Sequence, residues 1–111
     1  EKGAQAAKLL PKAEKAGRML YDFVRPDQFN LNDFDEEDYL EFDHYTISQM
    51  EPRKIWFEYY DRNSKGIKIL GPITAPKSVT ALLQKGWDIS CGFGKVLGKW
   101  QMVEVGNIYP N

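Results

Sequence analysis

The chain has 111 residues with one cysteine and one histidine, of which 42% are hydrophobic and 28% charged. This length suits one domain with a single core, and the composition is typical of a chain that folds. One cysteine and one histidine exclude an intrachain disulfide and most zinc sites, and no apolar run approaches the roughly 20 residues that span a bilayer. We therefore expect no metal, no other cofactor and no membrane partner.

The start of the sequence lacks the apolar core of a signal peptide, and nothing in it requires an oxidising compartment. The sequence therefore favours an intracellular protein of the nucleus or cytoplasm. The interior of an organelle is the alternative, since a chain that begins with Glu rather than Met fits a processed protein as well as an excised domain.

Charge is unevenly distributed along the chain. Residues 1–18 hold five basic side chains against two acidic, residues 19–51 one against ten, and residues 52–111 nine against four, which gives net charges of +3, −9 and +5. Such asymmetry bears on partners rather than on fold. We predict a helical extension or linker over residues 1–25, an acidic, aromatic-rich arm over 26–51 and a globular domain over 52–111.

The first part of the chain is predicted to be helical over residues 4–10 and 12–24. Ala, Lys, Glu and Leu dominate it, with an apolar stripe near the helical period. Pro11 is expected to break the helix or to start its second part. The stripe is narrow and rich in Ala, so we expect this helix to need a partner surface for its stability.

The acidic arm is predicted to be an extended segment, held by its aromatic side chains on this domain or on a partner. It is too aromatic for an ordinary disordered acidic tail. The acids from Asp33 onward suggest a calcium loop, but Asp38 stands where an EF-hand needs Gly and His44 where it needs the bidentate Glu. We therefore expect a solvent-exposed acidic face and no metal site.

Residues 53–60 are predicted to form a β-strand, because apolar or aromatic side chains recur at every second position from Ile55 to Tyr59. The two faces of that strand carry Ile55, Phe57 and Tyr59 on one side and Trp56, Glu58 and Tyr60 on the other. A turn over 61–66 and a second strand over 66–70 would complete a hairpin.

A helix is predicted over residues 76–85, because Pro76 suits a first helical turn and Gly86 a helix stop. Short strands are expected around 87–91, 95–97 and 100–105, separated by glycines. A hairpin, one helix and then short antiparallel strands make a small α+β fold.

Several landmarks in this order resemble the GYF and GYF-like domain family over roughly residues 53–108. They are Phe57-Glu58-Tyr59-Tyr60-Asp61, Gly66, Gly71-Pro72, an amphipathic helix, Lys85-Gly86-Trp87, and Trp100-Gln101 near the end. The resemblance implies a small α+β GYF-like domain that binds proline-rich peptides in an aromatic cradle beside the helix. Such peptides are extended before they bind, and they pack on flat aromatic faces.

The candidate peptide-binding residues, from the resemblance and from strand alternation together, are Trp56, Phe57, Tyr59, Tyr60, Ile73, Leu82 and Trp87. From the residues alone, Phe57 and Leu82 are predicted to be core. Trp56, Tyr60 and Trp87 are the stronger site candidates, because large aromatic side chains left exposed are common interface anchors.

The sequence offers little chemistry for an enzyme. His44 and Cys91 are lone and far apart in sequence, and we expect an inert buried cysteine and a loop histidine. The glycines and lysines of residues 92–99 lack the Walker spacing. We expect no catalytic residue.

The expected function is a non-catalytic protein–protein interaction module, which binds a proline-rich or extended peptide or docks in a larger multisubunit complex. The alternative is single-stranded nucleic-acid binding by the basic C-terminal half, where Lys95 and Lys99 lie near Phe93 and Trp100 in sequence. Cations interleaved with stacking rings are typical of such proteins.

Overall fold

A long helix and one five-stranded antiparallel sheet make up the fold. The computed structural model describes the backbone of residues 2–111 and the side chains from Ala7 onward. Its elements are α1 (Lys2–Val24), three short 3-10 helices (Pro26–Gln28, Leu31–Asp33 and Glu36–Asp38), β1 (Tyr39–Glu51), β2 (Lys54–Asp61), β3 (Gly66–Thr74), α2 (Lys77–Thr80), β4 (Asp88–Val96) and β5 (Lys99–Tyr109). The strand order is β3-β2-β1-β4-β5. The predicted α+β class is confirmed, but the order of elements differs from the GYF-like arrangement, because a helix and a full strand precede the hairpin.

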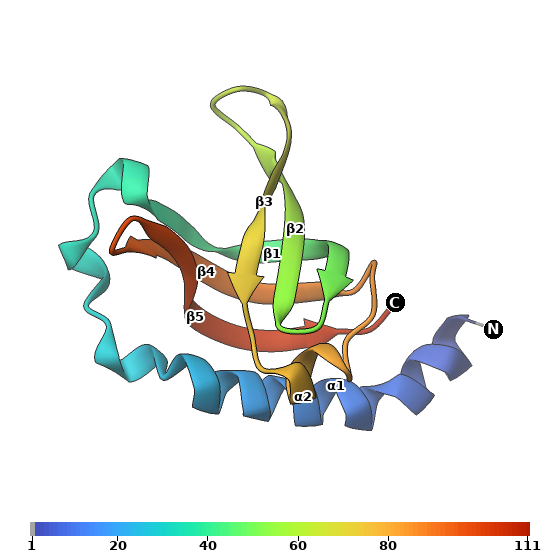
Figure 1. Cartoon of the computed structure of the whole chain (residues 1–111). Coiled ribbons are helices and arrows are strands. Elements are labelled where there is room, and N and C mark those ends of the chain that lie inside the picture. The colour runs from blue at the N-terminus through green and yellow to red at the C-terminus, as the bar shows by residue number, and fades with distance from the viewer. Residues whose placement is uncertain (1) are drawn as a thin grey trace.

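The first helix is continuous, so the predicted break at Pro11 is wrong. Proline inside a helix removes one hydrogen bond and costs about 3 kcal/mol. The buried residues of the helix, Ala13, Ala16, Leu20 and Val24, all follow Pro11. They pack toward β5, along which α1 runs (Figure 1). Their burial offsets the cost of the proline, and the helix is part of the core.

The acidic arm supplies the central strand of the sheet, which the sequence did not predict. Its first half forms three short 3-10 helices, and its second half is β1. Phe34 fastens the first half to the sheet, since a Cβ atom on Gly94 would lie only 2.6 Å from its ring. The ring of Phe34 also stacks on Tyr39, with centroids 6.1 Å apart. The arm therefore folds onto its own domain.

The sheet curls because β1 changes partner along its length. It pairs with β4 from Tyr39 to Thr46 and with β2 from Thr46 to Glu51. The β2–β3 hairpin consequently stands across the other three strands, with its tip pointing away from α1 (Figure 1). The core fills the concave side of this sheet, where the Phe93 ring meets the Phe57 ring at 5.3 Å and the Tyr45 ring at 4.9 Å.

The second predicted helix is much shorter than expected. A helix over 76–85 is wrong, since α2 ends at Thr80. The chain then returns to β1, where the Gly86 amide donates to the Ile47 carbonyl and the Ile47 amide to the Trp87 carbonyl, both at 2.8 Å. Before this return, the Leu82 and Leu83 amides still donate to the Val79 carbonyl, so one irregular turn follows α2. The short strands expected around 87–91 and 95–97 are parts of one strand, β4.

Within residues 2–111, no helix combines the length and the apolar character needed to cross a membrane. Although α1 is 23 residues long, charged side chains are spread along it.

Candidate functional site

Five of the seven predicted binding residues do not form an open surface. Phe57, Ile73 and Trp87 are at most 1% exposed and belong to the core. Tyr59 and Leu82 are half-buried and pack against that core. The aromatic cradle inferred from the family resemblance is therefore absent as a solvent-facing feature at these positions, because the sheet and α2 close over them.

The other two predicted residues, Trp56 and Tyr60, lie on the opposite face of β2, as the strand alternation predicted. Two isoleucines of β3 join them there. Tyr60 is 57% exposed, Ile67 65% and Ile69 58%. Tyr60 pairs directly with Ile67 across the hairpin, and Ile69 pairs with Glu58. We call Trp56, Tyr60, Ile67 and Ile69 the hairpin patch.

The indole of Trp56 is held in place at the base of the hairpin patch by a glycine. A Cβ atom on Gly71 would lie 2.6 Å from Cδ1 of Trp56 and 3.0 Å from its Cα. Gly71 also has a φ of +153°, a value that side-chain-bearing residues rarely adopt. The glycine therefore allows the half-buried indole to lie directly on the β3 backbone.

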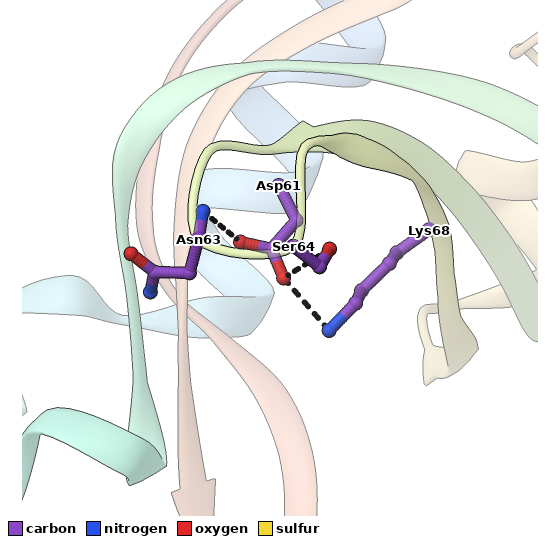
Figure 2. A network of polar contacts seen from close by, with 4 residues as sticks. All are labelled: Asp61, Asn63, Ser64 and Lys68. Carbon is purple, nitrogen blue, oxygen red and sulfur yellow. Dashed lines mark hydrogen bonds and ion pairs between the residues drawn. The ribbon is translucent and has the colours of Figure 1, made fainter.

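The tip of the hairpin is an ordered turn centred on Asp61 (Figure 2). Its carboxylate accepts hydrogen bonds from the Asn63 amide at 3.0 Å and the Ser64 hydroxyl at 3.1 Å. It also forms an ion pair with Nζ of Lys68 at 2.7 Å. These contacts fix the register that places Tyr60 opposite Ile67.

The same network predicts a measurable pH dependence of the turn. The hydrogen bond that Lys68 donates to Asp61 is the largest cause that lowers the pKa of Asp61 below 3.8. The same hydrogen bond is the largest cause that raises the pKa of Lys68 above 10.5. The contribution of Asp61 to stability is present above its unfolded-state pKa and is lost as the pH falls through its lower folded-state pKa. The contribution of Lys68 is present below its unfolded-state pKa and is lost as the pH rises through its higher folded-state pKa.

Carboxyl NMR titration tests this prediction. We expect Lys68→Met to raise the pKa of Asp61 toward 3.8. Lys65→Met, in the same turn, is the matched control and should leave it unchanged. An Asp61 midpoint that does not respond to Lys68→Met would show that the ion pair does not form in solution.

His44 and Cys91 come close in the fold but on opposite faces of the sheet. The register pairs His44 with Ser90 and Asp43 with Cys91. Cys91 is fully buried on the core side, and burial, followed by the charge of Glu104, raises the pKa of its thiol. The exposed imidazole of His44 instead stacks on Tyr109 with centroids 4.9 Å apart. The pair is therefore not a nucleophile and its base.

The basic C-terminal half offers few open rings for stacking. Nζ of Lys95 lies 5.9 Å from the ring centroid of the half-buried Trp100. Phe93 and Trp87 are in the core, whereas Tyr60 and Tyr109 are exposed. The mixture of cations and aromatic residues seen in the sequence is thus only partly present on the surface.

The part of the chain with described side chains contains no group of three or more His, Cys, Asp or Glu residues arranged to hold a metal ion. The hairpin patch is the surface on which predicted site residues and exposed apolar side chains coincide.

No protein-family model matches the chain, and searches of curated proteins and of solved structures found no significant match.

Proposed function

We propose that this chain is a non-catalytic protein–protein interaction module whose hairpin patch binds an extended peptide segment of a partner. The observation that carries the proposal is the exposure of Tyr60, Ile67 and Ile69 on one face of an ordered hairpin. Large apolar side chains that gather on a surface mark interaction sites, because water leaves them favourably when a partner covers them.

The shape of the hairpin patch favours an extended ligand over a globular one. Residues two apart on a strand face the same side at roughly 7 Å intervals, so Trp56 and Tyr60, which are four residues apart, lie roughly 13 Å apart along β2 with Glu58 between them. An extended or polyproline II segment spans that length in about four residues, and a polyproline II segment loses little entropy on binding. β3 is also an edge strand, which leaves its outer side open to the backbone of a peptide.

A proline-containing peptide is the class that we propose first. Proline rings pack well on flat aromatic faces, and the hairpin patch offers the rings of Trp56 and Tyr60. The resemblance to GYF-like domains supports the same ligand class. The binding face differs from that of the family, however, because the positions that match its cradle lie in the core of this protein.

Calorimetric titration with a synthetic proline-rich peptide tests the proposal. We expect the double variant Ile67→Ser/Ile69→Ser to weaken binding at least about tenfold, which corresponds to about 1.4 kcal/mol. Both side chains are exposed, so the variant should fold. Leu97→Ser is the matched control, since Leu97 is fully exposed on the turn between β4 and β5, away from the patch.

Two outcomes would contradict the proposal. One is equal affinity of the double variant and the native chain. The other is no binding of either a proline-rich peptide or an extended apolar peptide without proline.

A further inference from the structure

A groove opens where β1 and β2 separate, beside the hairpin patch, with which it shares Tyr60. β1 pairs with β2 only from Thr46 onward, so over residues 39–45 its strand partner is β4, on one side. β2 likewise has only β3 as a partner over residues 59–61. An unpaired strand edge exposes backbone donors and acceptors and is a template on which another strand can pair.

The groove between these two edges has a volume of about 510 Å³. Tyr45 and Tyr59 lie at its inner end, where their rings meet edge-on at 5.6 Å. The Tyr45 hydroxyl donates to the Glu41 carbonyl at 2.7 Å. Burial is the main cause that raises the pKa of both tyrosines, so both remain neutral at physiological pH. The inner end is thus aromatic and uncharged.

The walls of the groove are strongly acidic. Four carboxylates line it, those of Glu36, Glu41, Asp43 and Asp61, against the single guanidinium of Arg62. Asp61 is paired with Lys68, which does not line the groove, whereas the other three take part in no ion pair among the residues with described side chains. The groove therefore combines uncompensated negative charge with a strand edge that has no second strand partner, on which the His44 amide donates to the Asp43 carboxylate at 2.7 Å.

We infer that this groove binds an extended cationic peptide by strand addition to the free edge of β1. Backbone hydrogen bonds to residues 39–45 supply affinity, and lysine or arginine side chains of the peptide reach the carboxylates of Glu41 and Asp43. The same charges disfavour a second copy of the chain pairing through the same edge, because like charges would then meet across the new ladder. The negative charge of this edge therefore favours binding of a positively charged partner.

A short synthetic peptide that alternates lysine with threonine is the probe for this groove. We expect it to shift the amide NMR signals of residues 39–45 and 59–61 and to bind more weakly as salt is added. The charge-reversed variant Glu41→Lys/Asp43→Lys should bind at least about tenfold more weakly. Asp22→Lys/Asp27→Lys, an equal change of charge at exposed positions outside the groove, is the matched control.

Backbone methylation of the peptide separates strand addition from simple charge attraction. Two isomers, each methylated on the nitrogens of one edge, keep the full charge, and we expect one isomer to lose binding and the other to retain it. Equal binding of both isomers, equal binding by the charge-reversed variant, or self-association of the chain through this edge would overturn the inference. The hairpin-patch variant Ile67→Ser/Ile69→Ser should bind this probe normally, since neither isoleucine lines the groove.

Discussion

Replacing Leu20 with alanine is expected to lower the free energy of unfolding by about 2–5 kcal/mol. Leu20 is 1% exposed and lies in the stripe of α1 that packs on β5. The substitution removes three buried carbons and leaves a cavity that the flanking Ala16 is too small to fill. Urea denaturation, analysed by linear extrapolation, measures the loss.

Leu10 provides the control within the same helix. It is 47% exposed, so Leu10→Ala makes the same chemical change without opening a cavity, and we expect an effect within about 0.5 kcal/mol. Similar small losses for both variants would show that α1 is a separate extension rather than part of the core.

Replacing Gly71 with alanine is expected to cost about 2–6 kcal/mol through two separate causes. A Cβ atom there would lie 2.6 Å from the Trp56 ring and 3.0 Å from its Cα, and the second contact is with backbone that cannot move aside. The φ of +153° adds strain of about 1–3 kcal/mol for a residue with a side chain. Crowding of a packed site adds a similar amount.

Gly66→Ala is the matched control for this substitution, in the same strand. Nothing lies within 4 Å of a Cβ atom at Gly66, and its φ is not positive. We expect a change within about 0.5 kcal/mol. If both alanine variants unfold at the same urea concentration, the close packing of Trp56 on β3 does not exist in solution.

The hairpin could be predicted from sequence because its signals are local. Strict alternation over 53–60 identified β2 and both of its faces, and the turn residues from Asp61 to Gly66 placed the hairpin tip. Trp56 and Tyr60 were found for the same reason. Ile67 and Ile69 were missed as site residues although they alternate in β3, because only the register shows that they join Tyr60 on one face.

The central strand could not be predicted because its own pattern is irregular. A bulge between Leu40 and Asp43 breaks the alternation of β1, and acidic side chains occupy its exposed positions. Only Tyr45 and Ile47 are fully buried along its length. The acids of residues 26–51 were therefore interpreted as a solvent-exposed face, whereas Glu41, Asp43 and Glu51 are exposed side chains of a strand. That strand pairs with the directly following β2 and with the distant β4.

The predicted aromatic cradle is not exposed, because tertiary contacts bury its residues. Trp87 follows Gly86 at the end of the predicted helix, which in sequence is equally consistent with an exposed ring and with a buried one. The backbone bonds between β1 and residues 86–87 draw Trp87 into the core, where its exposure falls to 1%. The length of α2 was overestimated because its regular part ends at Thr80, and the residues after Leu83 return to β1.

The central claim is that the hairpin patch binds an extended partner segment, and its most direct test is shift mapping by NMR with a proline-rich peptide. We predict the largest changes at the Trp56 side-chain amide and at the backbone amides of Tyr60, Ile67 and Ile69. Changes confined to residues 39–45 of β1, changes confined to the region of Lys95 and Trp100, or no changes at all would contradict it.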